Sequence, residues 1–180
     1  MNTWALEIAP RLAGALALAL NLLGFVVIDE RRTKLLLAAS SAGWAVQYGF
    51  NGVHTGMGIM VLAAIRQALS AYTFHWPFKR RLALSWFFTA LAVLITSLTW
   101  QGWLSSSLPL AATLIGTWSF FVLSNEGMRK ATLVSNLMWG LHGFLFNSLE
   151  LCITMLVLTG ATLVGLWRLR REHASLQARG

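Results

Sequence analysis

Seven apolar runs constrain the fold of this chain more than any other feature. They cover residues 12–28, 35–51, 56–74, 82–100, 108–123, 131–148 and 151–167. None alternates as a membrane β-strand does, and a hydrocarbon core admits only helices or closed barrels. One helical crossing needs about 20 residues, so seven crossings use most of the 180 residues. We therefore expect an all-α integral membrane protein that forms a single domain in contact with the lipid bilayer.

The composition supports the same interpretation. The chain is 57% hydrophobic and 11% charged, whereas a soluble domain has about 25% charged residues. Its net charge of +8 comes from short basic clusters between the apolar runs, a pattern typical of membrane topology signals. We therefore expect no nucleic-acid partner. Cys152 is the only cysteine, which excludes an intrachain disulfide.

The basic clusters also predict an orientation. They lie in segments 29–34, 75–81 and 124–130, and in the tail 168–180. With seven crossings all of them fall on one side, while the other side carries only Arg11. The positive-inside rule then places the N-terminus outside and the C-terminus in the cytoplasm.

A polar and aromatic pattern occurs twice in the sequence. The stretch "SSAGWAVQYGFNG" is echoed 95 residues later by "SNLMWGLHGFLFNS". The matching pairs are Ser40 with Ser135, Trp44 with Trp139, and Gln47 with His142. Residues 12–74 and 108–167 therefore look like two parallel three-helix repeats, related by an axis along the membrane normal. Residues 82–100 would be the linker helix of this 3+1+3 arrangement.

Four further motifs carry a resemblance to a known family. They are "DERRTK" after the first run, "AAIRQ" in the third, "LPLAATLIGTWSF" in the fifth and "GLWRLRR" at the end of the last. With these motifs in order, nearly the whole chain resembles the bacterial inner membrane protein YgjV family. The resemblance implies an inner-membrane location and supplies no established activity.

More remotely, the chain resembles the SWEET and PQ-loop (MtN3-like) transporters, in which two three-helix bundles surround a central solute path. That resemblance implies transport. Those transporters characteristically have a proline hinge in the first helix of each bundle. Here Pro10, Pro77 and Pro109 lie at the ends of the expected spans.

The repeated pattern places polar groups on one helical face. Ser40, Trp44, Gln47 and Asn51 are spaced i, i+4, i+7 and i+11. In the second copy Ser135, Trp139 and His142 also share one helical face, and Asn136 lies on an adjoining stripe. Two such stripes could line a solute path, with indoles stacking on the solute and amides orienting it. The alternative is that the polar groups only join helices through hydrogen bonds, while the tryptophans fill the space between helices.

Arg66 lies inside the third run, about 12 Å from its cytoplasmic end if each residue of the helix rises by about 1.5 Å. A charged group at that depth is costly, so backbone carbonyls and water, or a solute anion, should pair with it. Snorkelling of the side chain toward the cytoplasm is the alternative. The predicted solute-contacting residues are therefore Trp44, Gln47, Asn51, Arg66, Asn136, Trp139 and His142.

His54 and Glu150 are 96 residues apart and end their repeats on the outer side. If the repeats are related by a twofold axis, the two side chains meet across the outer mouth. A histidine–carboxylate pair there would form a gate sensitive to pH. The alternative is two separate interfacial side chains.

The sequence has no HExxH, CxxC or GxSxG motif and no paired carboxylates inside a run, so we expect no enzyme, no metal site and no cofactor. It has no P-loop either. We expect a passive or ion-coupled transporter of a small polar or anionic solute. The alternative is a membrane scaffold or partner-binding protein, and homo-oligomer formation stays open.

Overall fold

The computed structural model describes residues 3–51, 54–100, 102–145 and 149–177. Within these ranges the chain forms seven α-helices and no strand, as the apolar runs predict. The helices are α1 (Thr3–Val26), α2 (Glu30–Phe50), α3 (His54–Thr73), α4 (Phe78–Leu98), α5 (Trp103–Val122), α6 (Asn125–Leu145) and α7 (Leu149–Gln177).

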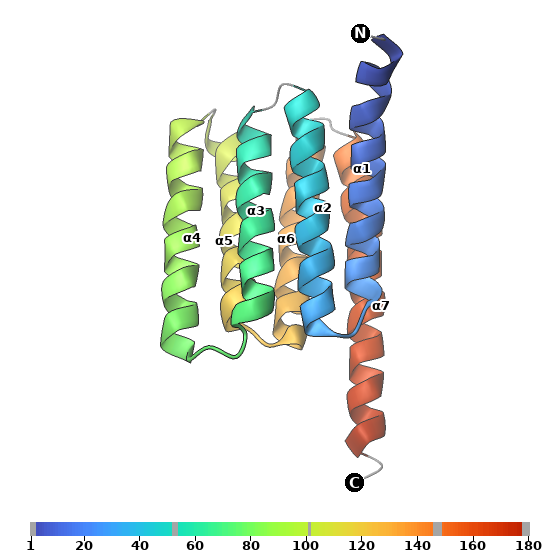
Figure 1. Cartoon of the computed structure of the whole chain (residues 1–180), viewed down its shortest axis with the longest axis vertical. Helices are drawn as coiled ribbons and strands as arrows, with labels where there is room; N and C mark the ends of the chain where they lie inside the picture. The colour runs from blue at the N-terminus through green and yellow to red at the C-terminus, as the bar shows by residue number, and fades with distance from the viewer. Residues whose placement is uncertain (1–2, 52–53, 101, 146–148, 178–180) are drawn as a thin grey trace.

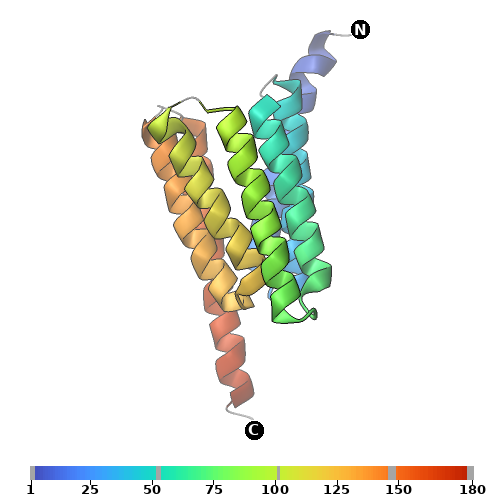
Figure 2. The same cartoon turned by 90° about the vertical axis from the view of Figure 1, so that its left-hand side faces the viewer.

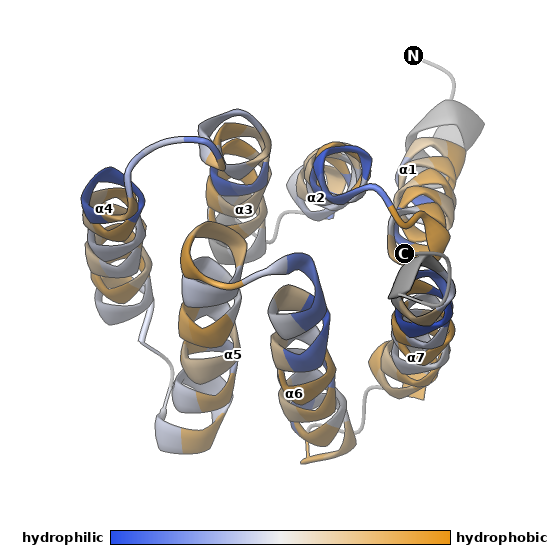
Figure 3. Ribbon diagram, turned by 90° about the horizontal axis from the view of Figure 1, so that it is seen from below, coloured by the Kyte–Doolittle hydropathy of each residue, from blue (hydrophilic) through white to orange (hydrophobic). Residues whose placement is uncertain are grey.

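The helices stand side by side and alternate in direction (Figure 1). Seen along the bundle, α4, α3, α2 and α1 form one row and α5, α6 and α7 form a second row (Figure 3). Helices that follow one another within a row are in contact, and α1 contacts α7 and α3 contacts α5 across the rows. Helix α4 also packs on α5 and closes one side of the bundle (Figure 2).

The charged turns gather at one end of the bundle. The α1–α2, α3–α4 and α5–α6 turns lie at the end from which α7 extends (Figure 1). Figure 3 views the bundle from this end and shows hydrophilic residues gathered there. We call it the basic end, because it holds the basic clusters of segments 29–34, 75–81 and 124–130.

Local chemistry explains where several helices begin. The Asp29 carboxylate accepts a hydrogen bond from the backbone N–H of Arg32 at 2.7 Å, which caps the start of α2. Pro77 precedes α4 with its φ fixed by the ring. Gly102 precedes α5 with a φ of 141°, a conformation open to glycine because it has no Cβ.

All seven helices begin before the apolar runs that predict them. Helix α1 begins at Thr3 and α5 at Trp103, so Pro10 and Pro109 lie inside helices and not at span ends as expected. Helix α7 continues to Gln177. Hydropathy locates only the apolar part of a helix, whereas the Arg, Leu, Glu, Ala and Gln residues of segment 168–177 favour a helix outside the apolar layer as well.

Four of the described helices are long and apolar enough to cross a membrane. The segments are Ile8–Val26, Phe78–Leu98, Trp103–Val122 and Leu151–Glu172. Helices α2, α3 and α6 are not among them, although each has 20 or 21 residues. Their buried positions hold polar side chains such as Ser40, Arg66 and Asn136, which lower the hydropathy of helices that face the interior.

Two apolar clusters hold the rows together. The first consists of Phe25, Leu37, Phe120, Met128 and Leu158, and it joins five helices from both rows. The second, formed by residues of α3, α4 and α5, packs Phe88 against Phe121 with ring centroids 5.6 Å apart. The packing of both rows therefore depends on residues far apart in the sequence.

Helix α7 approaches the end of α1 very closely at Gly165. A Cβ built there would overlap the backbone carbonyl of Phe25 and the Arg129 guanidinium. Gly160, on the same helix, has open space around an added Cβ. Only the first position therefore needs a glycine for packing.

We predict opposite effects for alanine at these two positions. Gly165→Ala should lower the free energy of unfolding by about 1–3 kcal/mol, because the methyl group forces α7 away from α1. Gly160→Ala should raise it by about 0.5–1 kcal/mol, the helix preference of alanine over glycine. Thermal unfolding of the purified protein in detergent measures both. Equal effects would contradict the close approach.

Candidate functional site

A cavity of about 370 Å³ lies between the two rows, within the size range of ligand pockets. Six helices line it, and α4 contributes none of its lining residues. The lining reaches exposed Asn51 at the end of α2 and descends to the apolar cluster at Phe25 and Leu37. Four residues of this cluster, Phe25, Leu37, Phe120 and Leu158, are part of the lining.

The cavity brings together most of the predicted solute-contacting residues. Its lining includes Trp44, Gln47, Asn51, Arg66, Asn136 and Trp139. His142 is not among the lining residues; its ring packs edge-to-face on Trp139, with centroids 5.8 Å apart. Contact of these residues with a solute stays a prediction.

The predicted gate cannot be placed in the same way. His54 is the first residue of α3 and Glu150 is the second residue of α7, but their side chains lie outside the described residues. The expected pairing of the two groups therefore stays a prediction.

The repeated serines make matching helix contacts. The Ser40 hydroxyl donates to the carbonyl of Ala17 at 2.7 Å, and the Ser135 hydroxyl donates to the carbonyl of Ala112 at 3.2 Å. Donors and acceptors are displaced by the same 95 residues that separate the two sequence copies. The same contact therefore joins α1 to α2 and α5 to α6.

Arg66 is 6% exposed and points across from α3 to α5. Its Nη1 donates to the Thr117 hydroxyl at 2.7 Å and to the Thr113 carbonyl at 3.2 Å. Its guanidinium lies 5.5 Å from the ring centroid of Phe120. Within the described part of the chain no carboxylate pairs with it, so no opposite charge compensates its own.

Three buried polar atoms of the cavity lining have no hydrogen-bond partner among the described residues. They are Asn21 Oδ1, Arg66 Nε and Asn136 Nδ2. A buried polar atom left unsatisfied costs about 1–3 kcal/mol, and native structures hold few of them. A hydrogen-bonding solute or water that reaches these atoms would satisfy them.

Sequence reasoning missed Asn21 as a lining residue. It is the only polar side chain in the run 12–28. A polar group inside an apolar membrane helix normally faces the bundle interior, so the signal was present in the sequence.

A second buried arginine joins the two rows at the basic end. Arg129 of α6 is 0% exposed. Its guanidinium donates to the backbone carbonyls of Phe25 and Val27 and, at 3.1 Å, to the Thr33 hydroxyl. Sequence reasoning assigned Arg129 to a cytoplasmic loop, and nothing in its surroundings in the sequence signals burial.

Other residues complete the cap on α1. Asn125 donates to the carbonyl of Ile28 at 2.8 Å, and Arg168 donates to that of Val26 at 3.2 Å. The last carbonyls of a helix lack partners within it and carry partial negative charge. We call Asn125, Arg129 and Arg168 the α1 clamp; it ties the first row to α6 and α7.

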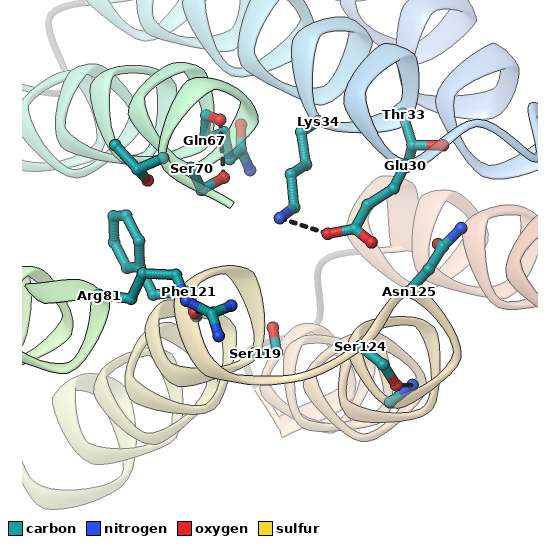
Figure 4. Close-up of polar contacts among 12 residues, drawn as sticks. Glu30, Thr33, Lys34, Gln67, Ser70, Arg81, Ser119, Phe121, Ser124 and Asn125 are labelled. Carbon is teal, nitrogen blue, oxygen red and sulfur yellow. Dashed lines mark hydrogen bonds and ion pairs between the residues drawn. The ribbon is translucent and has the colours of Figure 1, made fainter. Parts of the chain in front are cut away.

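The corresponding position in the first repeat behaves differently. Lys34 precedes Arg129 by 95 residues and is 3% exposed, but it forms an ion pair with Glu30 at 2.6 Å (Figure 4). The end of α5 is capped instead by Arg81 of α4, which donates to the Phe121 carbonyl at 3.2 Å (Figure 4). The clamp on α1 therefore has no counterpart from α2.

The extension of α7 is held to α6 by charge. Arg170 hydrogen-bonds Glu126 at 3.1 and 3.2 Å, and Lys130 lies 2.8 Å from the same carboxylate. The hydrogen bonds from Lys130 and from Arg170 lower the pKa of Glu126. The contact is exposed, so we expect it to add little to stability.

We predict that Arg129→Gln lowers the free energy of unfolding by about 1–3 kcal/mol, because it leaves buried carbonyls of α1 without donors. Lys130→Gln is the matched control. Its side chain is 54% exposed, and its loss should change stability by no more than about 0.5 kcal/mol. Chemical or thermal unfolding in detergent compares them. Similar values for the two variants would refute the buried clamp.

Comparison with known proteins places the chain in a family. The model of the Imp-YgjV family, described as "bacterial inner membrane protein", matches residues 8–173. Because the match covers most of its length, the chain belongs to that family, as its motifs predict. No curated protein and no solved structure matches the chain.

Proposed function

We propose that this bacterial inner membrane protein carries a small polar or anionic solute across the membrane, passively or coupled to an ion. The observation behind the proposal is the cavity between the two rows. Polar and aromatic side chains from both copies of the repeated pattern line it, among them Trp44, Gln47, Asn136 and Trp139.

The architecture that fits this function is two parallel three-helix repeats, α1–α3 and α5–α7, with α4 as the linker. The matching Ser40 and Ser135 bonds support it. So do the cross-row contacts, since α1 meets α7 and α3 meets α5, the pairs expected from a twofold relation. All seven helices would then cross the membrane.

The orientation follows from charge. The basic end would face the cytoplasm, with the N-terminus outside and the C-terminus inside. The cavity lining includes exposed Asn51 at the opposite end. The present arrangement would therefore be closed toward the cytoplasm and accessible from the outer side.

Transport would proceed by rocking of one repeat against the other around the cavity. The α1 clamp and the apolar cluster of the cavity lining would close the cytoplasmic side, so both must separate for the solute to leave. Trp44 and Trp139 would stack on the solute, and Gln47 would orient it. This is binding and movement, without a chemical step.

A test of this mechanism needs no knowledge of the solute. Ser119 is 0% exposed and lies in the last turn of α5, toward the basic end; Figure 4 labels it. In a Cys152→Ser background, Ser119→Cys should react slowly with an impermeant maleimide from the cytoplasmic side of inverted vesicles. A disulfide between Ile28→Cys and Asn125→Cys should suppress the reaction, and Arg129→Gln should accelerate it severalfold.

The control reporter is Arg80→Cys, at an exposed position of the basic end, which should react equally in every variant. If Ser119→Cys reacts at one rate whether the clamp is cross-linked, intact or lost, the rows do not separate there. That result would favour the membrane scaffold.

A further inference from the structure

The cavity has a single charged lining residue among those described, Arg66. Resting on the function proposed above, we propose that the solute is a small monocarboxylate and that the Nε–Nη2 edge of Arg66 binds its carboxylate.

The hydrogen bonds of Arg66 leave one edge of the guanidinium without a partner among the described residues. Those within the described residues come from Nη1, to Thr117 and Thr113 of α5. Nε is buried without a partner, and Nε and Nη2 point to the same side of the planar group. Two parallel N–H donors at this spacing match the two oxygens of a carboxylate.

The threonine bonds position the guanidinium without neutralising it. Thr117 also donates to the Thr113 carbonyl at 2.8 Å, so both α5 groups keep a partner when Arg66 is absent. The structure of α5 therefore does not require the arginine. An uncompensated charge inside a membrane protein is costly, which suggests that its partner is a ligand.

The other orphaned atoms fit the remainder of such a solute. Asn136 Nδ2 is a donor and Asn21 Oδ1 an acceptor, and they come from α6 and α1. Together they can bind a hydroxyl or amide on the carboxylate's body. Trp44, Tyr48 and Trp139 supply an apolar lining, on which a flat or short aliphatic body can pack.

Charge selects against other anions. One guanidinium compensates one negative charge, and the described lining offers no second cation. A doubly charged phosphate would bring excess negative charge into an apolar site, which is unfavourable. A neutral sugar would leave the Arg66 charge unpaired.

The test compares each carboxylate with its uncharged amide on the purified full chain. The probes are acetate, lactate, phenylacetate and nicotinate against acetamide, lactamide, phenylacetamide and nicotinamide, with inorganic phosphate as a non-carboxylate anion. Thermal unfolding at neutral pH and millimolar probe measures binding. At least one carboxylate should raise the midpoint with at least tenfold higher affinity than its amide, and phosphate should not.

Arg66→Gln should abolish this preference, and Arg66→Lys should retain part of it. Lys130→Gln, which removes an exposed cation, should leave it unchanged. A second readout uses the empty protein: Arg66→Met should unfold at the same temperature as the wild type or higher, because it removes an uncompensated buried charge.

Several results would overturn the inference. These are the absence of a shift with any carboxylate, amides that stabilise as well as carboxylates, or a preference that survives in Arg66→Gln. A large fall in the midpoint of empty Arg66→Met would show that the arginine is structural. The cysteine-reactivity test uses no solute, so transport can stand when the carboxylate assignment fails, and the reverse also holds.

Discussion

The bonds between Arg129 and the last carbonyls of α1 are the constraint on which the rest of the arrangement depends. The last carbonyls of a helix lack partners within it, and residues of α6 and α7 supply the donors. The two rows therefore meet at the basic end. The lining of the cavity runs from the apolar cluster at Phe25 and Leu37 to exposed Asn51 at the opposite end.

The other buried arginine, Arg66, differs from Arg129 in its partners. Arg129 directs its donors at carbonyls that need them, whereas Arg66 has an edge without any partner in the described residues. One arginine thus holds the bundle together, and the other leaves a charge to be compensated inside the cavity. This contrast is why we assign a structural part to Arg129 and a ligand to Arg66.

How far the sequence predicts this molecule depends on the kind of signal. The helical class and the family follow from apolar runs and motifs, and helical spacing leads from Trp44 and Trp139 to one cavity. Helix ends are less predictable, since hydropathy does not show that α7 continues to Gln177. Arg129 was missed because its partners are backbone carbonyls about 100 residues away, which leave no side-chain pattern.

Transport by the proposed mechanism requires the rows to separate at the basic end when the α1 clamp opens. This separation is tested most directly by the distance between spin labels at Arg32→Cys on α2 and Lys130→Cys on α6, both exposed positions, in a Cys152→Ser background. We expect two distance populations, with the longer one enriched by Arg129→Gln. A single narrow distribution that Arg129→Gln leaves unchanged would contradict it.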